Sequence, residues 1–396
     1  MSNRLPKYIR NCTGCMACVD ICPMHCITSE LHKDGHLHPK IDTTTCINCG
    51  LCYKVCPVLA TDVVKSDRGY NKGYCSWANN MDIRKRSASG GVFAEIASKI
   101  IKDGGVVVGA TMKNSVVEHR IIDKLEDLHL LQGTKYQQGD LSSIYKKCID
   151  LLSNGNMVLF SGVPCQVTAI SHYAKLKHCE ANLYTIDLIC GGFPSKLPLQ
   201  IFKDNEKEVV DVLSYRSKRN GWKPRGFKYN LITIDQEGNE KSWGENNIVI
   251  GSFCTSLTSR LVCSACPFAK RKRSSDITIG DYWGESQYSE QHTDGVSAVV
   301  VHTQKGDWLL QKADITIKET SIEDIAKCNY RLLDGRNFFI RLHPAWIFRT
   351  FILNHFSYKN LKFIYSADDN RDILNMLYRS ILYLCNNLNS LTRKYF

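Results

Sequence analysis

From about residue 83 onward, apolar and polar positions alternate in the two rhythms of helices and strands. Apolar residues recur at helical spacing from Val92 to Ile101, between a glycine-led start and the breaker Asp103-Gly104-Gly105. Continuous apolar runs predict buried strands at 106–112, 117–123, 157–161 and 183–189, and helices are expected at 140–153 and after residue 166. Strands that alternate with helices indicate a sheet covered by helices, so we expect an α/β (α+β) body.

The first sixty residues contain a cysteine repeat and lack this periodicity of apolar residues. A run of the form C-x-x-C-x-x-C-x-x-x-C, followed by proline, occurs twice, at Cys12, Cys15, Cys18 and Cys22 and again at Cys46, Cys49, Cys52 and Cys56. In bacterial ferredoxins three cysteines of such a run bind one 4Fe-4S cluster and the fourth crosses to the other cluster. The spacing therefore predicts one cluster on Cys12, Cys15, Cys18 and Cys56 and a second on Cys46, Cys49, Cys52 and Cys22.

A pair of zinc ribbons is the alternative for this region, because C-x-x-C pairs also hold tetrahedral zinc. Two complete runs that both end in Cys-Pro favour iron–sulfur clusters. Gly14 and Gly50 supply backbone freedom for the tight turns that the motifs need. Cys26 is expected to pack beside a cluster without binding it. We place this ferredoxin-like domain at residues 1–64.

Four further cysteines stand at expected turns of the body. Cys165 and Cys190 each follow a predicted strand, and Cys263 and Cys266 form a C-x-x-C ahead of a proline. Together they could hold a third 4Fe-4S cluster, or they could be buried thiols without a metal. A helix N-terminus lowers the pKa of a thiol, so Cys165 is placed to be a thiolate ligand or a nucleophile. Cys254 is a reserve ligand.

Three other features of the body are candidates for binding a cofactor. Ser89, Gly90 and Gly91 open a helix whose free N–H groups suit a dinucleotide pyrophosphate, although without G-x-G-x-x-G spacing the turn could be only a cap. The basic run at 270–273 is interpreted as a solvated face or as a clamp for flavin phosphates or an acidic partner. Asp281, at a strand end, could contact a cofactor or cap a turn.

Composition and charge narrow the classes of function. With 43% hydrophobic and 23% charged residues, the 396-residue chain is ordinary for a soluble protein of several domains. No apolar stretch is long enough to cross a bilayer and no secretion signal is recognisable, so we expect a cytoplasmic protein. In that reducing compartment, the 19 cysteines favour metal ligation over disulfides. The net charge of +12 falls to about +6 when three clusters are counted. No basic stripe with stacking aromatics indicates nucleic-acid binding.

Residues 336–396 are expected to form a helical tail. Apolar residues between 371 and 395 approximate one helical face. Packing against the body is the expected role of this tail, and peripheral membrane contact is the alternative.

Taken in order, several segments resemble the beta-subunit family of coenzyme F420 hydrogenase/dehydrogenase, with a ferredoxin-type domain fused in front. These segments are Ser89-Gly-Gly91, Gly109-Ala-Thr111, Gly133-Thr-Lys-Tyr136, Ser161-Gly-Val-Pro-Cys-Gln166, Cys190-Gly-Gly-Phe-Pro-Ser195, Arg216 to Trp222, Cys263-x-x-Cys-Pro-Phe268 and Ser275-Asp-Ile-Thr-Ile-Gly-Asp-Tyr-Trp-Gly284. The resemblance implies an N-terminal-like region at 83–165 and a C-terminal-like region at 166–335. It also implies FAD and a 4Fe-4S site in the body on Cys165, Cys190, Cys263 and Cys266.

Candidate cofactor contacts are Ser89, Gly90, Gly91, Lys135, Tyr136, Gln166 and Asp281, and the weak candidates for a catalytic acid or base are Lys135, Tyr136 and Asp281. Two positions depart from the family's pattern. Gly191 stands where many bacterial relatives have histidine, so proton transfer by that histidine is absent or moved. Gly139 stands where relatives often have serine, which puts a flavin contact there in question.

A flavin exchanges a hydride with an organic substrate, whereas clusters carry single electrons, so FAD can convert between the two. We therefore expect an iron–sulfur flavoprotein oxidoreductase that passes electrons between a hydride carrier, F420H2-like or nicotinamide, and a one-electron partner protein. The alternatives are a non-catalytic electron-transfer subunit that docks on another oxidoreductase and a redox accessory of polysaccharide biosynthesis. The sequence leaves open the donor, the acceptor, the direction of electron flow and the oligomeric state.

Overall fold

The computed structural model describes residues 11–60, 70–219, 221–222, 230–244, 247–284, 293–327, 329–332 and 347–365. Within this part of the chain no helix is both long and apolar enough to cross a membrane. The tail helix expected at 371–395 lies outside the described residues.

The N-terminal module, residues 11–60, contains two short helices and one antiparallel hairpin. Its elements are α1 (Ala17–Asp20), β1 (Ile27–Leu31), β2 (Leu37–Ile41) and α2 (Leu51–Val55). Each helix follows the turn of one cysteine motif. Gly14 and Gly50 have φ of 69° and 77° in these turns, a left-handed conformation that glycine adopts without strain. The turns that the motifs predict are therefore present.

The body is built on one eight-stranded mixed sheet with the order β13-β3-β12-β11-β7-β6-β4-β5. The strands are β3 (Lys72–Ala78), β4 (Val106–Lys113), β5 (Val116–Ile122), β6 (Val158–Gly162), β7 (Leu183–Leu188), β11 (Ile277–Asp281), β12 (Ser297–Val301) and β13 (Ile315–Thr320). Five of them, β3, β4, β6, β7 and β11, run in one direction. Their carboxyl ends meet at one edge, where ligands bind in open α/β sheets.

Helices cover both faces of this sheet, and the alternation of side chains along each strand decides which residues each face buries. The helices are α3 (Met81–Arg86), α4 (Val92–Lys102), α5 (Leu128–Leu131), α6 (Ile144–Ser153), α7 (Pro164–Leu176), α10 (Gln304–Lys312) and α11 (Ile322–Lys327), with short 3-10 turns at Leu125–Asp127, Glu180–Asn182, Leu261–Ser264 and Tyr330–Leu332. On β6, Val158 and Phe160 join the core under α6 and α7, while Leu159 joins the core under α4 and α10.

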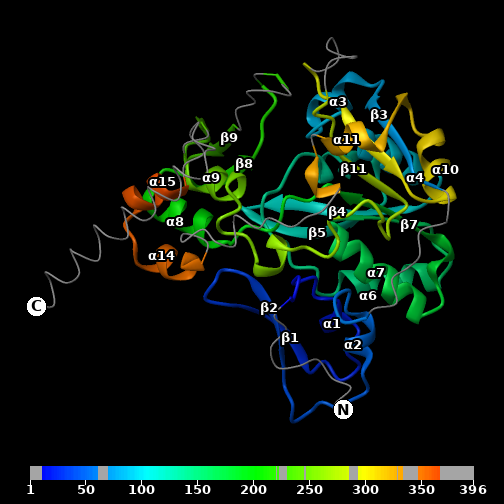
Figure 1. Cartoon of the computed structure of the whole chain (residues 1–396), viewed down its shortest axis with the longest axis horizontal. Coiled ribbons are helices and arrows are strands. Elements are labelled where there is room, and N and C mark those ends of the chain that lie inside the picture. Colours follow the sequence, from blue (N-terminus) through cyan, green and yellow to red (C-terminus); the bar gives the residue numbers. More distant parts are fainter. Residues whose placement is uncertain are drawn as a thin grey trace, which may run out of the picture.

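The N-terminal module shares the first of these cores with the body. Ala17, Ile21 and Val55 of the module are at most 4% exposed and belong to the same cluster as Tyr145 and Phe160 of the body. Figure 1 shows the module, in blue, beneath the sheet and against α6 and α7. Burying aliphatic side chains of this size contributes about 1.5–3 kcal/mol each, so the module is packed onto the body through a hydrophobic core.

A second, smaller layer lies beside the main sheet. It contains β8 (Asp211–Ser214), β9 (Leu231–Ile234), β10 (Glu240–Trp243), α8 (Leu197–Asn205), α9 (Ile248–Cys254), α14 (Arg349–His355) and α15 (Tyr358–Tyr365). Phe202, Tyr215 and Tyr365 form the centre of its separate core, each 0% exposed. The last two helices, shown in orange in Figure 1, pack on α8 and α9.

The predicted mixed α/β body is confirmed, and its helix at 92–102 and its strands lie within one or two residues of their expected bounds. The helix expected from residue 140 begins later, at Ile144. Asp140 accepts hydrogen bonds from the N–H and hydroxyl of Ser142, and Ser143 has φ of 70°, so a turn precedes the helix. The boundary expected at 165/166 falls inside one sheet, because β6 and β7 pair across it.

Candidate iron–sulfur and cofactor site

The first predicted ligand group, Cys12, Cys15, Cys18 and Cys56, gathers within the module. Burial, together with the neighbouring thiols of Cys56 and Cys12, raises the pKa of Cys15 to about 12. Burial and nearby thiols also raise the pKa of Cys18 well above its ordinary value. Four thiolates this close repel one another, so the group needs a cation among its sulfurs before all four can ionise. This is the electrostatic setting of a metal cluster.

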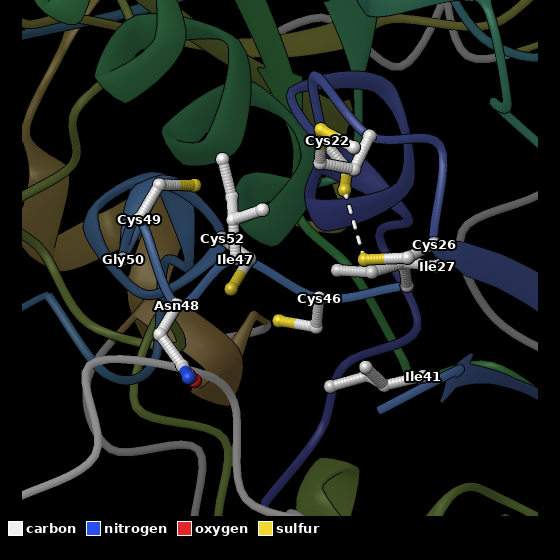
Figure 2. A pocket seen from close by; sticks show the side chains of 11 residues that line it. Cys22, Cys26, Ile27, Ile41, Cys46, Ile47, Asn48, Cys49, Gly50 and Cys52 are labelled. Atoms are coloured by element: carbon white, nitrogen blue, oxygen red, sulfur yellow. Dashed lines mark hydrogen bonds between the residues drawn. The ribbon is translucent and has the colours of Figure 1, made fainter. Parts of the chain in front are cut away.

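The second predicted group lines a pocket that is partly open to solvent (Figure 2). Of this group, Cys22 comes from the first motif, and Cys46, Cys49 and Cys52 come from the second. The side chains of Met24, Ile27, Ile41 and Ile47 form its apolar wall. Cys26 also lies at this pocket, with its Sγ atom 3.4 Å from that of Cys22.

The distances between the cysteine sulfur atoms distinguish a zinc site from a larger metal cluster. Tetrahedral zinc, with Zn–S bonds of about 2.3 Å, holds its sulfurs about 3.8 Å apart. Among the residues that the structure describes, no three cysteine sulfurs lie within 4.8 Å of one another. The cysteine groups are therefore more widely spaced than a zinc ribbon requires.

The fold brings the four body cysteines to the carboxyl edge of the sheet. Cys165 follows β6 at the start of α7, and Cys190 follows β7, the neighbouring parallel strand. Cys263 lies in the 3-10 turn Leu261–Ser264, and Cys266 comes two residues after it. Each of the other three thiols contributes to raising the pKa of Cys165. Cys254 is exposed at the end of α9.

Backbone groups and a buried arginine hold this quartet in place. The N–H of Gly192 lies 3.3 Å from the sulfur of Cys190, and the N–H of Phe193 lies 3.5 Å from that of Cys263. N–H donors of this kind stabilise thiolate sulfur in clusters. Arg331 donates to the carbonyls of Cys263 and Gly191 and so ties the two segments together.

One expectation for Cys165 is wrong. Its position at the start of α7 predicts a lowered pKa, but burial raises the pKa well above the ordinary value, and the thiols around it raise it further. The desolvation of a fully buried thiol outweighs the dipole of the helix. Cys165 is therefore a protonated thiol unless a metal is bound.

The body quartet lies next to the first group of the module. After burial, Cys15 is the largest influence on the pKa of Cys165. Burial raises the pKa of Tyr145 on α6, and both of these thiols raise it further. The Tyr145 ring is 0% exposed and stacks on the ring of Phe160, with the centroids 5.8 Å apart. The three cysteine groups thus follow one another from the pocket of Figure 2 to the edge of the sheet.

A buried guanidinium joins the module to the body. Arg260 is 2% exposed and donates to the carbonyls of Cys12 and Leu37 and to the side-chain oxygen of Gln138, while the amide of Gln138 donates to the carbonyl of Gly14. A Cβ at Gly14 would lie 2.3 Å from Gln138 Nε2, so only glycine fits there. Sequence reasoning missed this contact, because its partners lie far apart in the chain.

A carboxylate of the module also caps a helix of the body. Asp20 accepts hydrogen bonds from the N–H groups of Ser143 and Lys146 at the start of α6. These are two of the N–H groups that a helix cannot satisfy by itself. This contact, too, gives no signal in the sequence.

The turn Ser89-Gly90-Gly91 lies between the ends of β3 and β12. Gly90 donates to the hydroxyl of Ser297, and a Cβ on Gly90 would lie 2.5 Å from the carbonyl oxygen of Ser76. Packing against the sheet is therefore sufficient reason for glycine at this position. Gly91 caps α4 with φ of 89°, and no side chain caps the first N–H groups of that helix. Those groups can still meet an anion, so the predicted pyrophosphate contact stays a prediction.

Lys135 and Tyr136 follow α5 and point into different surroundings. Lys135 donates to the carbonyls of Leu130 and Gln132, and burial lowers its pKa to about 7. Tyr136 stacks on Phe253 of α9, with their ring centroids 3.7 Å apart. Lys135 can therefore change its protonation state near neutral pH, whereas the Tyr136 ring is packed against the smaller layer.

Gln166 and Asp281 are engaged by the protein itself. The side-chain oxygen of Gln166 accepts from the N–H of Val163 and caps α7. Asp281 accepts from Arg216 at 2.6 Å, and the guanidinium of Arg216 also lies over the ring of Trp283. Cofactor contacts by these two residues stay predictions.

Comparison with known proteins matches both parts of the chain. Residues 155–325 match the C-terminal model of the coenzyme F420 hydrogenase/dehydrogenase beta-subunit family, and residues 11–60 and 38–91 match two models of a 4Fe-4S dicluster domain. The region at 155–325 is therefore similar to the C-terminal part of the beta-subunit family. The module is a 4Fe-4S dicluster domain.

Individual relatives are similar to most of the chain or to a short part of it. The coenzyme F420-dependent sulfite reductase of Methanocaldococcus jannaschii is 23% identical over 80% of this chain and 48% of its own length. NADH-quinone oxidoreductase subunit I 2 of Symbiobacterium thermophilum is 38% identical over 12% of this chain and 22% of its own. The chain thus spans about half and about a fifth of these two relatives. A chain of the F420-reducing [NiFe] hydrogenase complex from Methanosarcina barkeri aligns with a TM-score of 0.47 and 18% identity, over 67% of this chain and 90% of that one.

The basic run of the beta-subunit region is only in part a solvated face. Arg271 is exposed and pairs with Glu323. Arg273 is buried, 3.6 Å from the fully buried carboxylate of Asp187. Charge-run reasoning missed this buried pair, which keeps Arg273 from binding an external anion.

The two positions that depart from the family's pattern differ in their surroundings. A Cβ at Gly191 would make an ordinary contact with the ring of Phe253, at 3.5 Å, so the structure gives no steric reason for glycine there. A Cβ at Gly139 would lie 3.2 Å from the carbonyl oxygen of Val117 on β5, a tight contact that a small shift of the strand would relieve.

Proposed function

We propose that the chain is an iron–sulfur flavoprotein oxidoreductase that passes electrons between a hydride carrier and a one-electron partner protein. The single observation that carries the proposal is the assembly of Cys165, Cys190, Cys263 and Cys266 at the carboxyl edge of the sheet, beside Cys15 of the module. This gives three four-cysteine groups in series. A chain that only carried a ferredoxin module would have no need of the third group.

Each group fits a 4Fe-4S cluster by its donor set. Twelve thiols in groups of four, together with N–H donors at Cys190 and Cys263, are the ligands and the hydrogen bonds that such clusters use. Clusters at these positions would transfer single electrons. The outermost group, at the pocket of Figure 2, includes the exposed Cys49 and is the natural place for exchange with a partner protein.

We propose that a flavin binds at the N-terminus of α4. The first N–H groups of α4, behind Gly91, have no side-chain cap, and Lys218 lies next to them, donating to the carbonyl of Ser89. These groups would hold a pyrophosphate at the edge of the sheet where the quartet also lies. A bound flavin would supply the exchange between two-electron hydride chemistry and single electrons. Lys135, with its pKa of about 7, is the residue of this region best suited to hold or release a proton.

Coenzyme F420 or a nicotinamide is the proposed hydride carrier. The relation to the beta-subunit family and to an F420-dependent sulfite reductase supports F420. The proposed place of action is the cytoplasm, where reduced thiols persist.

Anaerobic reconstitution tests the proposal. The chain is expected to bind about twelve irons, about twelve sulfides and one FAD, and reduced F420 or NADH should bleach its visible absorbance. Cys148→Ala is the matched control, because Cys148 is a buried thiol of α6 outside the three groups. Iron without flavin, and no bleaching by either donor, would instead establish a non-catalytic electron-transfer subunit.

A further inference from the structure

The turn of the module's hairpin brings together three side chains that the redox function does not use. His32 and Asp34 lie between β1 and β2, and His38 lies on β2. One ligand atom from each falls within 4.8 Å of the others, and within the described part of the chain this is the one group of three potential metal ligands so closely spaced.

The distances suit a metal ion better than hydrogen bonds. His32 Nδ1 lies 3.7 Å from Asp34 Oδ1, and His38 Nε2 lies 3.5 Å from Asp34 Oδ2. Hydrogen bonds between nitrogen and oxygen are about 2.7–3.2 Å long. Ligands held about 2.0–2.2 Å from a tetrahedral ion lie about 3.3–3.5 Å apart. His38 Nε2 is also shielded from solvent, and the acceptor that faces it is Asp34 Oδ2, at 3.5 Å.

The surrounding chain holds the carboxylate in position. Asp34 Oδ1 accepts a hydrogen bond of 3.0 Å from the N–H of His36. The turn is also fixed to the body, because Ser195 donates its hydroxyl to the carbonyl of Asp34 and Lys196 donates its N–H to that of Gly35. Supporting contacts of this kind orient metal ligands and strengthen binding. The exposed ring of His32 can close on an ion by side-chain rotation.

We propose that His32, Asp34 and His38 form a binding site for one divalent ion of the zinc type, separate from the iron–sulfur groups. Two imidazoles and a carboxylate are a donor set that zinc and similar ions prefer. The fourth position is open to water. Because the turn rests on residues 195 and 196, just after the segment of Cys190, the ion stabilises the contact between module and body.

The test uses the full-length chain with its clusters reconstituted. Zinc chloride is added, the protein is washed by ultrafiltration, and zinc and iron are measured in the same sample. The wild type is expected to retain one zinc per chain beyond a His32→Ala/His38→Ala variant, with equal iron in both. Asp34→Asn, which keeps an oxygen for the N–H of His36, should bind zinc at least tenfold more weakly.

A control and a second measurement keep the outcome clear. His25→Ala/His129→Ala removes two exposed histidines away from the turn and should retain zinc as the wild type does. Zinc should also slow hydrogen exchange of the amides at 31–38 in the wild type and leave it unchanged in the His32/His38 variant. Equal zinc in the wild type and that variant, or zinc that enters only as iron is lost, would overturn the proposal.

Discussion

The two regions that gather cysteines do so by different means. In the module, the ligands lie between residues 12 and 56, and tight turns bring them together. In the body, the four cysteines lie between residues 165 and 266, and two parallel strands with a distant 3-10 turn carry them to one edge of the sheet. The cysteines of the module can be grouped from their spacing in the sequence, whereas those of the body come together only when the whole sheet has formed.

Removing one cysteine from each region gives the largest effect. Cys46→Ala is expected to lose the outer cluster of the module, and Cys263→Ala the cluster of the body, about four irons in each case. Iron analysis and EPR after reduction measure both losses. If Cys263→Ala instead lost the irons of the module as well, the two regions would not be independent in their ligation. Cys148→Ala should keep all the iron.

The link between the regions is the next largest effect. Arg260→Met removes a buried cation and leaves the carbonyls of Cys12 and Leu37 and the side chain of Gln138 without their donor. Unsatisfied buried acceptors cost about 1–3 kcal/mol each, so for three of them we expect a loss of at least about 3 kcal/mol in the free energy of unfolding. Denaturant unfolding should show the module separating first. Arg271→Met, at an exposed pair, should change stability by less than about 0.5 kcal/mol.

Acid should weaken the sheet at its edge strand β5, where His119 lies. Burial, helped by the charge of Lys135, lowers the pKa of His119 to about 4, while its value in the unfolded chain is about 6.5. The unfolded chain therefore binds the proton more tightly, and stability is constant above about pH 6.5 but falls as the pH drops from 6.5 to 4. This group contributes about 2–3 kcal/mol to that loss.

His119→Phe is the variant that tests this, because the ring of His119 on β5 stacks on Phe160 of β6 in the same sheet. Its unfolding free energy, measured by anaerobic denaturant titration, should fall less steeply between pH 6.5 and 4. The exposed His129 serves as the control position. An unchanged slope in His119→Phe would exclude this histidine as the cause.

The smallest effect concerns the helix that the module caps. Asp20→Ala leaves the N–H groups of Ser143 and Lys146 without an acceptor and should cost about 1 kcal/mol. Thermal unfolding is the measurement. Glu30→Ala, at an exposed pair with Lys40, should be nearly neutral. Equal shifts in the two variants would mean that this cap contributes nothing to the junction.

The sequence predicts more about the module than about the body. Spacing alone gave both ligand groups of the module, and apolar periodicity gave the strands and the helix α4, because these signals are local. Spacing left the body quartet open, and the resemblance to a family supplied it. The pKa of Cys165 was predicted in the wrong direction, because burial cannot be read from a helix start.

Contacts between distant residues were beyond sequence reasoning. Arg260 joins positions 12, 37 and 138, and nothing near it in the chain signals that role. Arg273 looked like part of a charged surface, but it pairs with Asp187 inside the protein. Gly90 also packs against the sheet, where a Cβ would meet the backbone of Ser76 and Ser297, a constraint that its place in a Gly-Gly turn does not reveal.

The hydrogen bond from Arg260 to the carbonyl of Cys12 has a consequence for the synthesis of the protein on the ribosome. The two residues are 248 positions apart, so at about 5–20 residues per second the module leaves the ribosome on the order of ten to fifty seconds before its partner. During that interval the first motif lacks its final neighbours and is open to incoming iron and to oxygen alike. Maturation of this protein is therefore a matter of timing as well as of chemistry.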